Sequence, residues 1–295
     1  MKLIFLGADS FALPILKTLH ADQRADVIAV VTRPAKPAGR GLRPQPNPVM
    51  QMSKAMKLPV ILISDKKDWG KFAKIITKEK PDLAIIAGLG LIIPEEILDL
   101  LPNNFINIHP SLLPHYRGPA PVETAILGGD KEIGVTLMVT AAKMDAGPSL
   151  AQYKTVTAHL NAAQLYEKLS RLAARYIIDV ANSYLSGKIK PKPQNEQQAT
   201  YTHIITKVDG LVKLSDDPAE IYSKILAYHP WPGVFFAIGD TQIKIIDAKL
   251  KNNVLLIDKL QPAGKKVLSA IEFANGYGKL LTKFPKTVKL NMRQR

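Results

Sequence analysis

The residues best suited to chemistry lie in the segment F-I-N-I-H-P, residues 105–110. Its first five residues alternate like a strand, so Asn107 and His109 point to the same side. Pro110 ends the strand because proline has no N–H to donate. We therefore expect an amide and an imidazole together at a strand end, where open α/β sheets bind ligands. Neither is a strong nucleophile. Together they suit stabilisation of a carbonyl oxygen that becomes an oxyanion, and the histidine can also move a proton.

A carboxylate downstream strengthens this interpretation. Gly134–Val139 is typical of a further strand, and A-A-K-M-D-A-G-P follows it, with Asp145 in a turn rich in glycine and proline. A carboxylate there can hold an imidazole in one tautomer, favour its protonated form, or accept a proton through water. The plainer alternatives are a structural histidine and an aspartate that only forms the turn.

The elements that must position these groups follow an alternating pattern. Short apolar runs are expected to be strands at Lys2–Leu6, Val27–Val31, Val60–Ile63 and Leu83–Ala87. Helical spacing lies between them at Phe11–Leu19, Val49–Lys57 and Asp68–Lys78. This alternation predicts an α/β fold, a Rossmann-like and mostly parallel sheet covered on both faces. The first turn, G-A-D-S-F, lacks the G-x-G-x-x-G fingerprint, so no nicotinamide cofactor is expected.

The remainder of the chain predicts a second, smaller domain. A helix at 122–127, a strand at 149–156 and a long amphipathic helix at 160–185 complete the first domain, residues 1–188. Residues 189–204 have no apolar periodicity and contain prolines, which is typical of a linker. In 205–295 a helix at 218–228 precedes short strands at 234–238, 242–248 and 254–257, a pattern that favours a small β-barrel.

Arg33–Pro48 is the longest irregular segment and is strongly basic. It carries Arg33, Lys36, Arg40 and Arg43 among several prolines and glycines. Proline stiffens a loop and glycine permits unusual turns, so a shaped loop that contacts phosphate or nucleotide is one interpretation. An exposed connection with incidental charge is the other.

Composition restricts the classes of function. The 295 residues include 40 basic and 25 acidic side chains, a net charge of +15. Residues 190–295 hold 17 of the basic and 9 of the acidic ones, so the shorter part is denser in positive charge, which favours a polyanionic partner. The absence of cysteine excludes disulfides, thiolate zinc sites and a cysteine nucleophile. We find no signal peptide or apolar segment long enough to span a bilayer, and we expect a cytoplasmic protein.

Several motifs together resemble a known family. N-I-H-P-S-L-L-P-H-Y-R-G-P-A-P, G-V-T-L-M and M-D-A-G-P resemble the formyltransferases that use 10-formyltetrahydrofolate. The resemblance implies that Asn107, His109 and Asp145 are catalytic. R-P-A-K-P-A-G-R-G at 33–41, H-P-W-P-G at 229–233 and L-Q-P-A-G-K-K at 260–266 are similar to the family members that act on methionyl-tRNA.

The resemblance also implies binding residues and an OB-like second domain. The residues expected to enclose the folate are Gly88, Leu89, Gly90, Leu91, Ile92, Ser111, Leu112, Leu113, Pro114 and Met144. Leu89 is a departure, since many relatives carry tyrosine there. The residues expected to contact tRNA are Arg33, Lys36, Arg40, Arg43, Lys207, Lys265 and Lys266. The second domain departs most from the family, at Val208, Lys213, Leu214 and Leu226.

The resemblance implies formyl transfer from 10-formyltetrahydrofolate to the α-amine of methionine on initiator tRNA. We expect a monomer, because the tRNA must straddle both domains, and no metal, because the sequence contains no metal-binding cluster. The alternatives are the same chemistry on a small amine, such as glycinamide ribonucleotide or a nucleotide-linked amino sugar, a formylfolate hydrolase, and a basic RNA-binding module without catalysis. The linker and barrel count against the glycinamide acceptor. The intact N-I-H and M-D-A-G segments count against a binding module.

Overall fold

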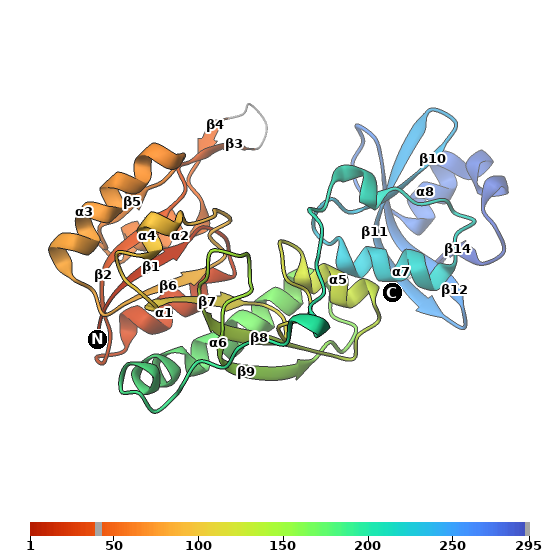
Figure 1. Cartoon of the computed structure of the whole chain (residues 1–295). Coiled ribbons are helices and arrows are strands. Elements are labelled where there is room, and N and C mark those ends of the chain that lie inside the picture. Colours follow the sequence, from red (N-terminus) through yellow and green to blue (C-terminus); the bar gives the residue numbers. More distant parts are fainter. Residues whose placement is uncertain (39–42, 293–295) are drawn as a thin grey trace. The chain divides into compact units, whose positions relative to one another are not determined.

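The computed structural model describes residues 1–38 and 43–292, which form two compact units (Figure 1). Unit 1 contains Met1–Pro121, Glu132–Val156 and Tyr166–Thr202. Unit 2 contains Val122–Lys131, Thr157–Leu165 and the part of the chain that begins at His203. The chain therefore passes between the units repeatedly. The predicted fold class, a mostly parallel α/β sheet followed by a smaller β unit, is confirmed. The domain boundaries predicted from the sequence stay a prediction.

Unit 1 is built on a seven-stranded sheet in the order β5-β2-β1-β6-β7-β8-β9. The strands are β1 (Lys2–Gly7), β2 (Asp26–Thr32), β5 (Val60–Leu62), β6 (Leu83–Ala87), β7 (Phe105–His109), β8 (Glu132–Val139) and β9 (Ser149–Val156). The first five in the order above pair in parallel, and β8 and β9 pair antiparallel at one edge. Apolar side chains on both faces of β1 are fully buried, as expected for parallel strands covered on both faces.

The carboxyl ends of β1 and β6 meet where the strand order reverses. From β1 the chain moves outward to β2 and β5, then returns to the other side of β1 as β6. The loops after these strands touch, because the N–H groups of Ala8 and Asp9 donate to the carbonyl oxygen of Gly88 at 3.0 and 3.3 Å. Such a reversal point is where open α/β sheets bind ligands. Strand β7, which carries the predicted catalytic residues, lies next to β6.

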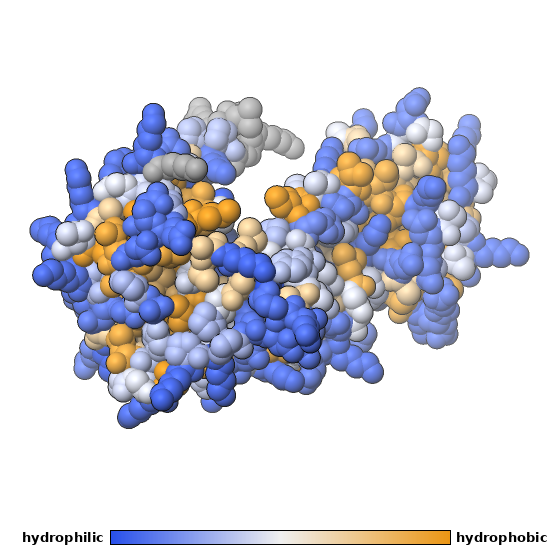
Figure 2. Space-filling view, viewed as in Figure 1, coloured by the Kyte–Doolittle hydropathy of each residue, from blue (hydrophilic) through white to orange (hydrophobic). Residues whose placement is uncertain are grey.

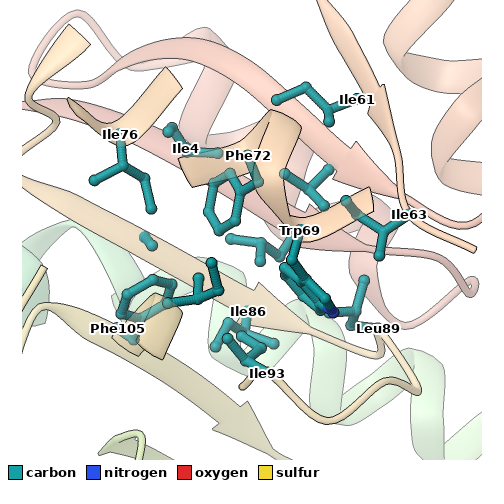
Figure 3. Close-up of a cluster of buried hydrophobic side chains, with 14 of the residues drawn as sticks. Ile4, Ile61, Ile63, Trp69, Phe72, Ile76, Ile86, Leu89, Ile93 and Phe105 are labelled. Carbon is teal, nitrogen blue, oxygen red and sulfur yellow. The ribbon is translucent and has the colours of Figure 1, made fainter. Parts of the chain in front are cut away.

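Helices cover the sheet and complete its core. They are α1 (Ala12–Ala21), α2 (Pro48–Ala55), α3 (Trp69–Glu79), α4 (Glu95–Leu98) and α6 (Ala162–Leu185), whose first four residues belong to unit 2. Helix α5 (Pro121–Leu127) belongs to unit 2 except for its first residue. Figure 3 shows the core between α3 and the sheet, where Trp69 and Phe72 of α3 pack with Phe105 of β7. The edge-to-face contact of Phe72 with buried Phe105 fixes the start of β7, and hence the residues at its end. Two short 3-10 turns, Lys66–Asp68 and Glu196–Gln198, complete the regular structure of this unit.

The basic segment Arg33–Pro48 contains more structure than its sequence indicates. Strands β3 (Lys36–Ala38) and β4 (Arg43–Gln45) pair antiparallel, with Pro37 opposite Pro44. Proline cannot donate to a ladder, so this two-stranded pairing is short and isolated from the main sheet. Asn47 then caps α2 by accepting from the N–H of Met50, which ends the segment.

Unit 2 is a five-stranded sheet with two main helices. The strands are β10 (Val234–Ile238), β11 (Thr241–Lys251), β12 (Val254–Pro262), β13 (Leu268–Ser269) and β14 (Val288–Leu290), and the helices are α7 (Pro218–Ala227) and α8 (Ala270–Tyr277). Strands β10 to β13 form an antiparallel series, and β14 joins β12 in parallel. Irregular pairing on both sides of Asp247 interrupts the long β11–β12 ladder. An irregularity of this kind bends the strand that contains it, here β11. Two 3-10 turns, Lys207–Gly210 and Gly278–Lys283, connect these elements.

Hydrophilic side chains cover most of the face shown in Figure 2, with smaller apolar areas between them. Across the described residues, every helix is too short or too polar to cross a bilayer.

Candidate active site

Three side chains predicted to be catalytic come together at the end of β7. Asn107 and His109 point to the same side of the strand, and Asp145 reaches both. The Asn107 Nδ2 atom donates to Asp145 Oδ1 at 3.4 Å, and His109 Nδ1 lies 3.6 Å from Asp145 Oδ2. The histidine and aspartate side chains are only 5% and 13% exposed, so water screens this contact weakly. One carboxylate therefore links an amide donor and an imidazole.

Asp145 is held in place by the backbone around it. It lies in the turn between β8 and β9 with a left-handed φ of 49°, which is uncommon for a residue other than glycine. The N–H of Gly118 donates to its Oδ2 atom at 2.8 Å. The turn itself closes tightly at Gly147, where a Cβ atom would lie 1.8 Å from the carbonyl oxygen of Val139. Glycine is thus required two residues after Asp145.

The hydrogen bonds of His109 restrict where its protons are. Its Nε2 atom lies 2.9 Å from the carbonyl oxygen of Tyr116, which can only accept, so Nε2 carries a proton. The opposite nitrogen, Nδ1, faces a carboxylate oxygen, which is also an acceptor. That contact is attractive only when Nδ1 is protonated as well. At 3.6 Å this approach is longer than a hydrogen bond, and it is an ion pair when the imidazole is protonated.

A buried arginine lies next to this group. Arg117 is fully buried, and its guanidinium donates hydrogen bonds to Gln194, Glu196 and Tyr201. Its guanidinium forms a two-point ion pair with Glu196, with contacts of 2.6 and 3.1 Å. Hydrogen bonds from Arg117 and Lys143 hold the pKa of Glu196 at about 2, and the same ion pair raises the pKa of Arg117. The pair therefore remains charged throughout the physiological pH range.

A second carboxylate lies where the loops after β1 and β6 meet. A Cβ atom on Gly88 would lie 2.0 Å from Asp9 Oδ1, so only glycine allows the carboxylate this close to the backbone. Asp9 is open to solvent on one side, yet surrounding protein atoms desolvate it. This desolvation raises its pKa to about 6, against the opposing effects of the Ala12 and Phe11 N–H groups and of Arg33. A carboxylate in a concave site explains both observations.

Family comparison identifies the chain. A model described as formyl transferase matches residues 1–181, and a model of the formyl transferase C-terminal domain matches residues 204–254. The chain belongs to the formyl transferase family. A methionyl-tRNA formyltransferase from Roseiflexus castenholzii is 35% identical over 301 residues, which cover 94% of this chain and 96% of that relative.

Solved structures show the same formyl transferase fold. A methionyl-tRNA formyltransferase from Clostridium thermocellum is 15% identical, with a TM-score of 0.62 over 91% of this chain and 99% of that one. An N-formyltransferase from Helicobacter canadensis, solved with folinic acid and dTDP-3-aminofucose, is 18% identical, with a TM-score of 0.65 over 86% and 89% of the two chains.

No three His, Asp or Glu side chains in the described part of the chain gather into a group that could hold a metal ion.

The residues expected to bind the formyl transferase's folate lie in the loops after β6 and β7 and, for Met144, in the turn between β8 and β9. Gly88 and Gly90 have φ values of 56° and 66°, so they turn the loop after β6. Leu89 is 2% exposed and belongs to the core shown in Figure 3, and the partly buried Leu91 packs against that core. Ile92, by contrast, is 74% exposed.

In the other loop, the expected folate residues are mostly committed to structural contacts. Ser111 and Leu113 are buried, Ser111 Oγ donates to the carbonyl oxygen of His115, and Leu112 packs over Gly134. The Pro114 carbonyl accepts from the N–H of Thr200. Met144, in the turn between β8 and β9, is 53% exposed. Their roles toward folate stay a prediction.

The residues expected to contact tRNA are divided between the units. In unit 1, Arg33 is half-buried beside Gly90 and Lys36 is exposed on β3. Arg43 begins β4, and Arg40 lies outside the described residues. In unit 2, Lys207, Lys265 and Lys266 are exposed, the last 4.0 Å from Glu272. Their roles toward RNA also stay a prediction.

Sequence reasoning missed Asp9, Arg117, Gln194 and Glu196. Arg117 lies inside the motif N-I-H-P-S-L-L-P-H-Y-R-G, but nothing in its spacing marks it as a buried side chain. Gln194 and Glu196 lie in the segment predicted to be a linker, which has no periodicity to mark them. In the structure residues 192–202 are hydrogen-bonded along unit 1. Only three-dimensional contact reveals these roles.

Proposed function

We propose that the protein transfers the formyl group of 10-formyltetrahydrofolate to the α-amine of methionine on initiator tRNA. The observation that carries this is one carboxylate, Asp145, in contact with the amide of Asn107 and the imidazole of His109 at the end of β7. The group lies in a chain that matches a methionyl-tRNA formyltransferase over 94% of its length.

Attack on the formyl carbon requires stabilisation of an oxyanion. The amine nitrogen forms a bond to the formyl carbon, and the formyl oxygen takes the negative charge. Asn107 donates to that oxygen from Nδ2. An amide nitrogen has two N–H groups, and the contact with Asp145 uses one of them. A positioned donor of this kind is typically worth a hundredfold to a thousandfold in rate, or about 3 to 4 kcal/mol.

Two proton transfers complete the reaction. The attacking amine must lose a proton, and Asp145 accepts it directly or through water. The bond from the formyl carbon to the folate nitrogen breaks, and that nitrogen must gain a proton as it leaves. His109, which lies beside Asp145, stabilises the oxyanion in its protonated form and supplies the proton, for which its Nε2–H exchanges the carbonyl oxygen of Tyr116 for the substrate. No covalent intermediate with the protein is needed.

The surroundings supply groups suited to both substrates. Exposed Ile92 and Met144 are apolar groups of the kind that cover an aromatic ring such as a pterin. The exposed basic residues Lys36, Lys207 and Lys265 suit the phosphates of tRNA. We propose a monomer that acts in the cytoplasm, where charged tRNA is available, and that needs no metal.

A small amine acceptor has less support. The Helicobacter canadensis N-formyltransferase was solved with a nucleotide-linked amino sugar, but at 18% identity it shares only the fold with this chain. The methionyl-tRNA formyltransferase from Roseiflexus castenholzii is 35% identical over 94% of this chain and 96% of its own length.

The experiment is direct. The protein is incubated with 10-formyltetrahydrofolate and methionyl-tRNA of the initiator type, and the ester is then hydrolysed to look for formylmethionine. We expect rapid formylation of initiator tRNA and much slower reaction with elongator methionyl-tRNA. Parallel reactions with glycinamide ribonucleotide and dTDP-3-aminofucose test the small acceptors. Faster formylation of either small amine would contradict the proposal.

A further inference from the structure

Residues 192–202 lie along the loops that build the active site. We call this segment the strap. Its ends are backbone pairs, with Lys192 bonded in both directions to Ser149 and Thr202 donating to the carbonyl oxygen of Arg117 at 2.8 Å. Between them, the N–H of Arg117 donates to the carbonyl oxygen of Thr200 at 2.9 Å. The strap thus contacts both the loop after β7 and the turn that holds Asp145.

Arg117 gives all five of its side-chain N–H donors to the strap. Nε and Nη2 donate to Gln194 Oε1 at 3.2 and 2.8 Å, Nη1 and Nη2 donate to Glu196, and Nη1 also donates to Tyr201 at 3.2 Å. Arginine has five such donors in a fixed plane. A buried guanidinium with every donor used defines the path of residues 194–201 closely, because any shift leaves a buried charge without a partner.

Gln194 connects this arginine to Asp145. Its Nε2 atom donates to the carbonyl oxygens of Asp145 at 2.9 Å and Gly147 at 2.7 Å, while its Oε1 atom accepts from Arg117. The opposite orientation of the amide would place its oxygen against two carbonyl oxygens and its NH2 group against the guanidinium, so only one orientation fits.

Both anchors of Asp145 therefore belong to one network. Gln194 holds its carbonyl oxygen, and the N–H of Gly118, the residue after Arg117, holds its carboxylate. We propose that the strap positions Asp145 for catalysis through Gln194, so that Gln194 is a positioning residue of the active site. The proposal rests on the function proposed above. The strap ends at Thr202, one residue before the last segment of unit 2 begins.

Two substitutions of Gln194 distinguish a role in positioning Asp145 from a role that only attaches the strap to Arg117. Gln194→Ala removes all of its contacts. Gln194→Glu keeps an acceptor for Arg117, and adds charge to it, but places a carboxylate oxygen against the carbonyl oxygens of Asp145 and Gly147. If Gln194 served only to attach the strap to Arg117, the glutamate variant would retain activity. A role in positioning predicts that both variants are impaired.

We expect both variants to lower kcat at least tenfold, because displacement of a reacting group by about 1 Å can cost a hundredfold. The KM values for folate and tRNA should stay within about twofold. The imidazole NMR signals of His109, identified by their loss in His109→Gln, should shift in both variants as the Asp145 carboxylate moves. The control, Glu167→Gln, breaks an exposed ion pair with Arg171 on α6 and should change neither quantity.

Wild-type kcat and unmoved His109 signals in Gln194→Glu would overturn the proposal. The NMR comparison needs no substrate. If the unaltered protein formylated no tRNA, the proposed function would fail, while the His109 signals would still decide whether Gln194 positions Asp145.

Discussion

Replacing Asp145 by asparagine tests the centre of the proposed mechanism. The side chain keeps its size, loses its charge and cannot satisfy its present partners. Its Oδ1 atom accepts from Asn107 and its Oδ2 atom accepts from the N–H of Gly118. An asparagine has one acceptor and one donor in these places, so in either orientation its NH2 group faces another N–H donor.

The size of the effect follows from the contact with His109. When His109 is protonated, the two unit charges 3.6 Å apart interact by about 4 to 5 kcal/mol at an effective dielectric constant of about 20. Water and neighbouring dipoles rearrange around His109 in the variant, and this recovers part of the lost interaction energy. The loss of a group that accepts the proton of the amine typically costs a further hundredfold to ten-thousandfold in rate. We therefore expect kcat to fall by about a thousandfold or more in Asp145→Asn.

The assay measures formylmethionyl-tRNA formation at saturating substrates from pH 5.5 to pH 9, with circular dichroism to establish that the variant folds. Asp99→Asn, which alters an exposed carboxylate after α4 in the same unit, is the matched control. The reasoning is refuted if folded Asp145→Asn keeps kcat within about tenfold of the unaltered protein with the same pH–rate profile. Asp145 would then be only a turn residue.

Three further predictions address other groups. His109→Gln should lower kcat at least a hundredfold with tRNA affinity within about twofold, and near-normal turnover would remove His109 from the mechanism. The raised pKa of Asp9, about 6 against 3.8 for the ordinary group, means that the folded protein binds this proton more tightly, so stability falls as pH rises from about 4 to about 6. Asp9→Asn should lack this fall, so at pH 7 it should be more stable than the unaltered protein by roughly 1 kcal/mol, a figure reduced because the carboxyl group is open to solvent. If the thermal midpoints of the variant and the unaltered protein differ by the same amount at pH 4 and pH 7, this prediction is wrong. Arg40→Ala should weaken tRNA binding and lower its salt slope by about one phosphate contact, whereas unchanged affinity and unchanged discrimination between tRNAs would make this loop an ordinary connection.

The sequence predicted the strands that carry chemistry because their patterns are local. Val234–Ile238, Leu83–Ala87 and Phe105–His109 begin and end at the predicted residues. The first two are apolar runs followed by glycine, and the third alternates and is followed by proline. The shared side of Asn107 and His109 follows from the same period of two.

What the sequence could not predict depends on contacts between distant residues. Glu196 has no apolar neighbours to give it a pattern, and its position is set by Arg117, 79 residues earlier. Asp9 appears in the sequence as one polar residue in a short turn, and its raised pKa exists only because the loop after β6 folds against it. Leu89 appears in the sequence as part of an apolar wall, but α3 supplies a core for it to enter (Figure 3).

The strap has a consequence for how this chain can be divided. The two family models leave residues 182–203 unassigned, and a protein engineer would naturally join parts from two relatives there. A first half that stopped at residue 188 would keep Asn107, His109 and Asp145, yet would carry Arg117 into its interior with none of the acceptors that residues 194–201 provide. Exchange of the C-terminal part of the chain between relatives should therefore succeed only with the junction after Thr202, so that the strap is inherited together with Arg117.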